Sequence, residues 1–192
     1  MKAVLMSIQP KWCELIASGK KTVEVRKTKP KLDVPFKVYI YCTKGKPTFT
    51  QSAFCDDVSN GKVVGEFVCD AIFPISCYYS DPNARFVNRE QPYTCLTDKE
   101  MIDYLGNGVE GYGWHITDLV IYDKPRELGE FIVPSKIGCC NEGKCRGCKY
   151  LDRGNGFNIE DDCNAKFCTD EYKPLRRPPQ SWCYVEEVND GT

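Results

Sequence analysis

Six short segments of the chain carry apolar residues either at every second position or in an unbroken run. Alternation has the period of a β-strand, in which successive side chains point to opposite faces of a sheet. A continuous apolar run of similar length is typical of a strand that is buried on both faces. The pattern therefore predicts strands over residues 3–8, 21–27, 36–42, 62–72, 112–122 and 181–187.

Two further segments have apolar residues at helical spacing. In the first, Trp12, Leu15 and Ile16 share one face, and a Ser-Gly pair follows that can end the helix. Pro10 suits the first turn of this helix. The second helix is predicted over residues 97–106, where Thr and Glu stand at capping-box spacing before the apolar positions and a Gly closes the segment.

Few helices and many strands in 192 residues predict an α+β fold built around a curved or closed sheet. No apolar run approaches the roughly 18 residues of a membrane span, and the first ten residues lack the features of a signal peptide. The cysteine count, 13, is odd, so we expect a cytoplasmic protein without a disulfide framework. The single His excludes multi-histidine metal centres.

Charge is distributed unevenly although the formal net charge is only −1. Residues 1–50 contain 11 Lys and Arg against 3 Asp and Glu, a net charge of +8. Residues 51–135 contain 6 against 14, and residues 136–192 contain 9 against 10. A basic N-terminal part suits phosphate binding, because cations neutralise a nucleic-acid backbone. Packing of the basic part against the acidic part is the alternative explanation.

Residues 19–26, Gly-Lys-Lys-Thr-Val-Glu-Val-Arg, bring several chemically active side chains into one predicted strand. Alternation sets Thr22, Glu24 and Arg26 on one face, with Lys21 directly before them. Burial of unpaired charges is costly, so we expect this face to line a solvent-connected pocket, with Ser7 and Lys11 near its rim. An exposed strand face held by an ion pair is the alternative.

Within this pocket Glu24 is a candidate general acid or base. We expect Arg26 to orient Glu24, whereas Lys21 is expected to be free to meet a phosphate or a carbonyl group. Trp182 and Tyr184, in the last predicted strand, could stack a base or belong to the core.

Four stretches resemble, in order, the signature of ASCH domains, which belong to the PUA-like superfold. They are residues 7–26, which include the motif G-x-K-T-x-E-x-R, and residues 62–67, 114–118 and 177–186. The resemblance implies a small PUA-like mixed β-barrel flanked by two helices, formed by residues 1–135 and 180–192. It also implies a basic cleft that binds RNA or a modified nucleoside. The predicted ligand-binding residues are Ser7, Lys11, Lys21, Thr22, Glu24, Arg26 and Trp182.

One branch of the family that this chain resembles hydrolyses the acetyl amide of N4-acetylcytidine. Its catalytic lysine corresponds to Lys21, but the position of its threonine nucleophile holds Glu24, and a carboxylate cannot replace a hydroxyl without changing the mechanism. For its catalytic glutamate, Glu100 is the only candidate. We therefore expect binding as the function. A hydrolase or ribonuclease that uses Lys21 and Glu24 is the alternative.

Residues 136–179 lack apolar periodicity and hold six clustered cysteines. These include one C-x-x-C pair and, after 14 intervening residues, a second pair separated by four residues. Two such pairs can supply four thiolates to a tetrahedral metal, so we predict a structural Zn²⁺ in an insert over 136–179. The predicted ligands are Cys145, Cys148, Cys163 and Cys168, with Cys139 or Cys140 as a substitute. Free thiols are the alternative, and the insert could also make the protein a zinc-dependent protein–protein adaptor.

Overall fold

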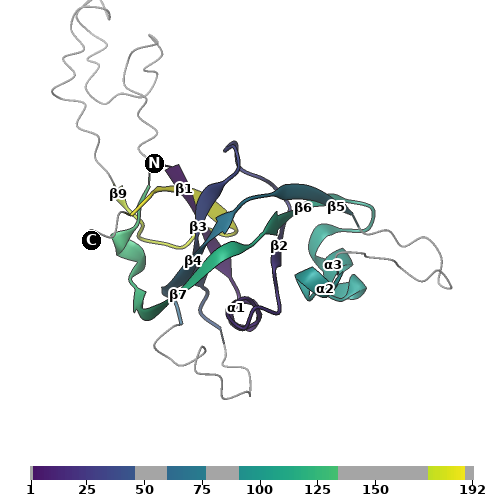
Figure 1. Ribbon diagram of the computed structural model, residues 1–192, viewed down its shortest axis with the longest axis horizontal. Helices are drawn as coiled ribbons and strands as arrows, with labels where there is room; N and C mark the ends of the chain where they lie inside the picture. Colours follow the sequence, from purple (N-terminus) through teal and green to yellow (C-terminus); the bar gives the residue numbers. More distant parts are fainter. Residues whose placement is uncertain (1, 46–59, 77–90, 134–172, 189–192) are drawn as a thin grey trace, which may run out of the picture.

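The computed structural model describes residues 2–45, 60–76, 91–133 and 173–188 (Figure 1). Within these ranges the fold is α+β and dominated by sheets, which confirms the predicted class. None of the described helices is both long and apolar enough to cross a membrane.

The larger sheet has five strands and contains one parallel pair, β1–β3. In order across the sheet, the strands are β10 (Trp182–Glu186), β1 (Lys2–Ile8), β3 (Phe36–Cys42), β4 (Val63–Cys69) and β7 (Thr117–Arg126). The other neighbours are antiparallel. Because parallel strands need a long crossover, the chain leaves the sheet between β1 and β3. This crossover holds α1 (Pro10–Ala17) and β2 (Val23–Arg26).

The smaller sheet has three strands in the order β2, β6 (Glu110–His115) and β5 (Ile72–Ser76). Two of the predicted strands are divided between the sheets. Residues 62–72 become β4 and the start of β5, and residues 112–122 become parts of β6 and β7. An alternating pattern records which side chains face inward, but it does not record where a strand bends.

Backbone hydrogen bonds hold the chain where these strands bend. The His115 amide donates to the Ala71 carbonyl at 3.0 Å, and the Ile116 amide donates to the Thr22 carbonyl at 2.9 Å. The described strands therefore form two sheets that are connected through these bends. They do not form the closed barrel that we expected.

Both predicted helices are present. α1 has a proline in its first turn and is followed by Gly19 in the left-handed region, with φ 71°. α3 (Asp98–Leu105) has the predicted capping box between Thr97 and Glu100. A further short helix, α2 (Gln91–Thr94), was not predicted. Figure 1 shows α2 and α3 together beside β5 and β6, apart from α1.

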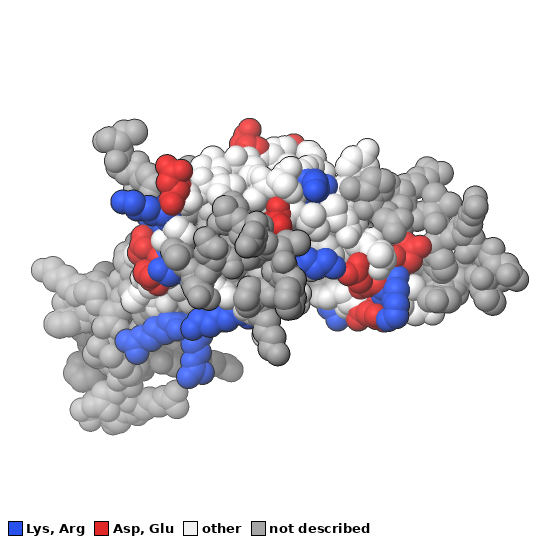
Figure 2. All heavy atoms as spheres, turned by 90° about the horizontal axis from the view of Figure 1, so that it is seen from below, with Lys and Arg blue, Asp and Glu red and all other residues white. Residues whose placement is uncertain are grey.

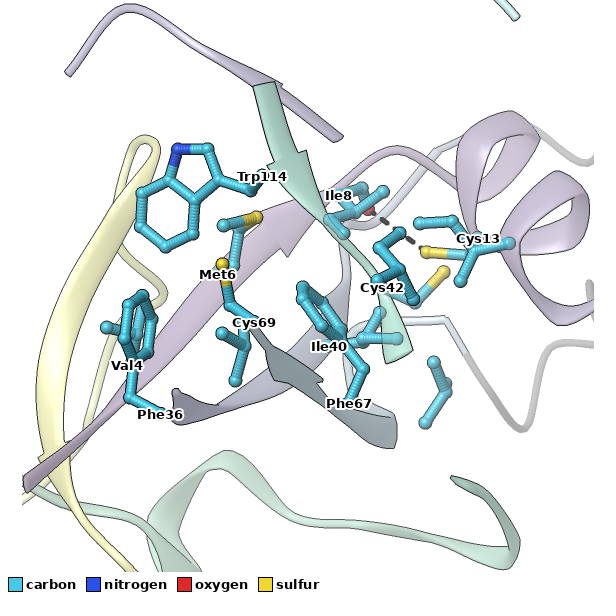
Figure 3. Close-up of a cluster of buried hydrophobic side chains, with 14 residues drawn as sticks. Val4, Met6, Ile8, Cys13, Phe36, Ile40, Cys42, Phe67, Cys69 and Trp114 are labelled. Carbon is cyan, nitrogen blue, oxygen red and sulfur yellow. Dashed lines mark hydrogen bonds between the residues drawn. The ribbon is translucent and has the colours of Figure 1, made fainter. Parts of the chain in front are cut away.

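The main core lies between the two sheets and α1 (Figure 3). Trp114 of β6 is fully buried there and meets Phe36 of β3 edge-on, with 5.7 Å between the ring centroids. A second core covers the other face of the larger sheet, where Phe131 lies 4.8 Å from the ring of Tyr39. β1 is buried on both faces, as its continuous apolar run predicted.

A third cluster joins the smaller sheet to α3. Val23 and Val25 of β2 pack with Met101 and Leu105 of α3. Because neighbouring residues of a strand point to opposite faces, this packing turns Glu24 away from α3 and toward the end of β1.

The short strands β8 (Ile132–Val133) and β9 (Lys173–Pro174) pair with each other, and a single 3-10 turn, η1 (Leu128–Glu130), precedes β8. This pairing brings together the described chain directly before and directly after residues 134–172. Most of the predicted insert, residues 136–179, lies outside the described residues.

Candidate functional site

A pocket of about 270 Å³ lies where β2 meets the end of β1, the start of α1 and the segment that leads into β10. We call it the β2 pocket. Its lining residues are Ser7, Ile8, Gln9, Trp12, Lys21, Glu24, Val25, Arg26, Thr43, Leu96, Tyr104, Gln180 and Ser181. The pocket therefore combines three charged residues with two aromatic rings and several polar side chains.

The three charged residues are almost completely buried, with exposed fractions of 1% for Lys21, 4% for Glu24 and 6% for Arg26. Their packing against one another makes this burial tolerable. Glu24 Oε1 pairs with the Arg26 guanidinium, and Glu24 Oε2 lies 3.2 Å from Lys21 Nζ. Two cations around one carboxylate leave an excess positive charge beside the pocket.

Arg26 also ties β2 to the end of β1. Its Nη2 donates to the Ser7 carbonyl at 2.7 Å, and its Nη1 donates to the Val25 carbonyl at 2.9 Å. The guanidinium therefore has a fixed position, and it orients the Glu24 carboxylate as we expected. This arrangement makes Arg26 a structural link as well as part of the pocket wall.

Lys21 is not free to meet a ligand, contrary to our expectation. Its Nζ donates to the Val23 carbonyl at 2.9 Å and to the Thr94 carbonyl of α2 at 2.5 Å. The reason is that the Lys21 side chain lies between β2 and α2, where its ammonium group donates to one backbone carbonyl of each element. Nζ also lies 5.1 Å from the Trp12 ring centroid.

Burial opposes ionisation of Glu24 and raises its pKa, but the charges of Arg26 and Lys21 outweigh this effect. The pKa of Glu24 therefore lies below its ordinary value of 4.5. At neutral pH this residue is an ionised carboxylate that can accept hydrogen bonds but cannot act as a general acid.

Two buried polar atoms of this cluster have unmet hydrogen-bonding capacity within the described part of the chain. Arg26 Nε donates to no acceptor, and Glu24 Oε2 accepts no hydrogen bond of good geometry beyond its ion pair with Lys21. Such atoms are rare in folded proteins and call for a partner. Both residues line the pocket, which makes a polar ligand the natural partner.

The structure brings together four of the predicted ligand-binding residues, and three others do not line the pocket. Ser7, Lys21, Glu24 and Arg26 line it, whereas Lys11, Thr22 and Trp182 do not. Thr22 lies before β2, where the alternation of the strand does not apply. Its backbone amide donates a hydrogen bond to the carbonyl of Tyr93, which lies in α2 and not in the smaller sheet.

Lys11 and Trp182 lie near the pocket but have other contacts. Lys11 Nζ pairs with Glu100 at 2.8 Å and lies 4.2 Å from the ring centroid of Trp12. The ring centroid of Trp182 lies 5.9 Å from that of Trp114, and Trp182 Nε1 donates a hydrogen bond to the Thr28 hydroxyl at 3.1 Å. Trp182 thus extends the core from β10.

Glu100, the candidate for a family glutamate, has a structural role. Its carboxylate accepts a hydrogen bond from Lys11 in an ion pair and another from the Thr97 amide, and these two contacts lower its pKa to about 2. A carboxylate with such a pKa is a poor base at neutral pH. Glu100 is also absent from the residues that line the β2 pocket.

Sequence reasoning missed several lining residues. Trp12 and Tyr104 stand at apolar positions of helices, where an aromatic residue is expected to be core. Gln9 and Gln180 are exposed and lie just outside predicted elements. The one available signal was that Trp12 and Tyr104 each combine a ring with a polar group, which is useful where a helix borders a wet pocket.

The six clustered cysteines of the predicted zinc site, 139, 140, 145, 148, 163 and 168, lie outside the described residues. In the part of the chain that the structure describes, no group of three or more His, Cys, Asp and Glu could hold a metal ion. Burial raises the pKa of Cys69 to about 12 and of Cys183 to about 11, as expected for small core residues.

The model of the ASCH domain family matches residues 6–106, which is more than half of the chain. Similar solved structures include an ASCH protein from Zymomonas mobilis, with 20% identity and a TM-score of 0.48 over 96% of this chain and 88% of that one. A mutant form from the same organism has 21% identity and a TM-score of 0.46 over 67% and 77%. No curated protein matches this chain.

Proposed function

Because the chain belongs to the ASCH domain family, we propose that its β2 pocket binds a nucleobase, presented by RNA or by a modified nucleoside. The polar lining of the pocket and its aromatic walls support this function.

The observation that carries the proposal is the pair of buried polar atoms with unmet hydrogen-bonding capacity. Arg26 Nε is a donor, and Glu24 Oε2 is an acceptor held ionised by its neighbours. The edge of a nucleobase offers acceptors and donors side by side, so one planar ligand can match both kinds of group. A purely anionic ligand would match Arg26 but would be repelled by Glu24.

The size and the walls of the pocket support the same ligand. A volume of about 270 Å³ lies just below the range of drug-sized sites, so it suits one small ring system. Trp12 and Tyr104 are half-buried in the lining, where rings can stack on a base. Base stacking on an aromatic residue contributes roughly 1–3 kcal/mol.

Binding, and not amide hydrolysis, is the function that these residues favour. Glu24 replaces the hydroxyl nucleophile of the hydrolase branch, and the Lys21 ammonium is occupied by two carbonyls. We expect no release of acetate when the protein is incubated with N4-acetylcytidine and the products are separated by chromatography. Turnover that a Glu24→Gln variant abolishes would instead establish the hydrolase alternative.

The binding proposal can be tested by titrating the protein with the four ribonucleosides, N4-acetylcytidine and a mixed RNA pool. The readout is tryptophan fluorescence, because Trp12 lines the pocket. The double variant Gln9→Ala, Gln180→Ala removes two exposed lining side chains, and we expect binding about threefold to tenfold weaker, as for one or two lost hydrogen bonds.

A Lys99→Ala variant is the matched control, since Lys99 lies on the exposed side of α3 in an ion pair with Asp103. It should bind like the wild-type protein. No binding of any of these ligands, or equal binding by the double variant, would overturn the proposal.

For residues 136–179 we retain the prediction of one structural Zn²⁺ on Cys145, Cys148, Cys163 and Cys168, which the cysteine spacing supports. Elemental analysis of the purified protein should find about one zinc per chain, and a Cys148→Ser variant should hold less. Protein without stoichiometric zinc would refute this prediction.

A further inference from the structure

Some basic residues of the described chain form ion pairs with carboxylates, and others, among them Lys2, Lys20 and Lys124, have no ion pair with a described residue. Five cations outside the β2 pocket form ion pairs with carboxylates, namely Lys11, Lys37, Lys62, Lys99 and Arg126. In contrast, Lys27, Lys29 and Lys31 are exposed, and none has a carboxylate within ion-pair distance among the described residues. These three lysines, which we call the basic strip, follow β2 directly.

Hydrogen bonds and burial hold the residues between the strip lysines in place, so the segment presents its lysines to the same side. The Thr28 hydroxyl accepts from Trp182 Nε1 at 3.1 Å, and Pro30 is buried. The backbone amide of Lys31 donates to the Tyr184 hydroxyl at 2.7 Å. Both aromatic partners belong to β10, which holds this segment against the edge of the larger sheet.

The basic strip begins at the β2 pocket. Arg26, which lines the pocket, directly precedes Lys27, and Lys27 Nζ lies 5.4 Å from the ring centroid of Tyr104, another lining residue. Lys29 Nζ lies 5.5 Å from the ring centroid of Tyr112 in β6. A ligand that leaves the pocket past Tyr104 therefore meets a line of cations.

The segment that carries this strip contains little negative charge. Asp33 is the one acidic residue between β2 and β3, and it makes no ion pair with a described lysine. Figure 2 shows a run of Lys and Arg side chains along one edge of a face on which basic and acidic side chains elsewhere lie side by side. Clustered cations of this kind attract polyanions.

We propose that the basic strip binds the phosphates of a single-stranded RNA whose base occupies the β2 pocket. This inference rests on the proposed function and extends it from a nucleoside to a strand. A single strand fits because a base can enter the pocket only when it is unstacked and unpaired. Cations beside stacking rings are the arrangement by which proteins bind such strands without reading their sequence.

The test compares two ligands, the nucleoside that binds best and an RNA octamer that contains it. The triple variant Lys27→Ala, Lys29→Ala, Lys31→Ala removes the strip. The triple variant Lys2→Ala, Lys20→Ala, Lys124→Ala removes the same charge from exposed lysines at other places and serves as the control. Dissociation constants are measured at several salt concentrations, and thermal unfolding checks that each variant is folded.

We expect the strip variant to bind the octamer at least about tenfold more weakly at low salt, with nucleoside binding unchanged. Each phosphate contact with a single strand contributes about 0.7 to the slope of log affinity against log salt, so three contacts contribute about 2. Over a fourfold rise in salt, the wild-type protein should then lose about 20-fold more affinity for the octamer than the strip variant loses.

The outcomes separate the two proposals. The proposal for the basic strip would be overturned if the strip variant kept the octamer affinity and salt slope of the wild-type protein, or if the control variant lost as much affinity. Either result would leave the proposal for the β2 pocket unaffected. Octamer binding that depends on the strip but not on Gln9 and Gln180 would overturn the pocket while leaving the strip. Failure of the wild-type protein to bind either ligand would overturn both.

Discussion

The buried charged cluster of the β2 pocket and the basic strip are neighbours in sequence but use their charges in opposite ways. Lys21, Glu24 and Arg26 are buried and paired with one another. The strip lysines that begin one residue later are exposed and have no ion pair with a described residue. The difference arises because β2 is covered on both faces, whereas the chain after it leaves the smaller sheet.

This comparison indicates that the two regions contribute to ligand binding in different ways. A buried ionic cluster is costly to assemble, and it persists only if its geometry is good. Its rigid groups can therefore recognise the shape of a ligand. Exposed lysines adapt to a flexible chain and contribute affinity that depends on salt. The following predictions test whether the two regions differ in this way.

Removal of a partner from the buried cluster should have the largest effect. Arg26→Ala would leave Glu24 buried beside one cation and would also free the Ser7 carbonyl. Breaking a buried pair typically costs about 3–5 kcal/mol, so we expect the free energy of unfolding to fall by about that amount. Urea unfolding measures it. A loss below about 1 kcal/mol would show that the cluster is solvated and that burial does not distinguish the two regions.

Lys21→Ala should also destabilise the fold, because Lys21 Nζ bonds the Val23 and Thr94 carbonyls and pairs with Glu24. We expect a loss of about 2–4 kcal/mol in the same urea experiment, as for a buried charge left with fewer partners. A variant as stable as the wild-type protein would restore the earlier expectation that Lys21 is free to meet a ligand.

Acid should weaken the buried cluster and not the strip. The pKa of Glu24 is lowered in the folded state, so the unfolded chain binds more protons near pH 4.5. The stability that Glu24 contributes is therefore fully present above about pH 4.5 and is lost as the pH falls through its lower folded value. Unfolding followed against pH should show this loss, and a Glu24→Gln variant should have a flatter profile.

Glu100 allows a check on this assignment, because its pKa of about 2 places its own loss of stability between about pH 4.5 and pH 2. A Glu100→Gln variant should remove that part of the profile and leave the part due to Glu24. Identical profiles for the wild-type protein and the Glu24→Gln variant would contradict a lowered pKa for Glu24.

Much of the fold could be predicted from the sequence, because periodicity depends on burial. The α+β class, both main helices and the capping box of α3 are present as expected. The two long strands, 62–72 and 112–122, were wrong in extent. Their hydrophobic pattern is unbroken where the chain bends, and the bends depend on backbone hydrogen bonds such as that from Ile116 to Thr22.

The site could be predicted only in part. The G-x-K-T-x-E-x-R motif located three charged residues at the pocket, but not their burial. Alternation cannot show that a second layer, here α3 packed on Val23 and Val25, covers the far face of the strand. Gln180 reaches the pocket from the other end of the chain, and no local pattern encodes that contact.

A smaller effect is expected from the helix that supports the pocket wall. Thr97→Ala removes the hydroxyl that accepts a hydrogen bond from the Glu100 amide at the start of α3. Loss of such a cap costs about 1 kcal/mol, which urea unfolding can resolve. Because α3 carries Tyr104, nucleoside binding should weaken slightly as well. A Thr97→Ser variant keeps the capping oxygen and is the control, with little change expected in either measurement.

The smallest effect on stability is expected from the basic strip itself. Loss of Lys27 and Lys29 removes two contacts with tyrosine rings, each worth roughly 0.5–1 kcal/mol at an exposed site. The triple alanine variant also relieves the mutual repulsion of three lysines and keeps the anchors at Thr28 and Pro30. The two effects oppose each other, so the free energy of unfolding should change by less than about 1 kcal/mol. A much larger loss would mean that the lysines hold the fold together, as the buried cluster does, and that their exposure is not kept for a ligand.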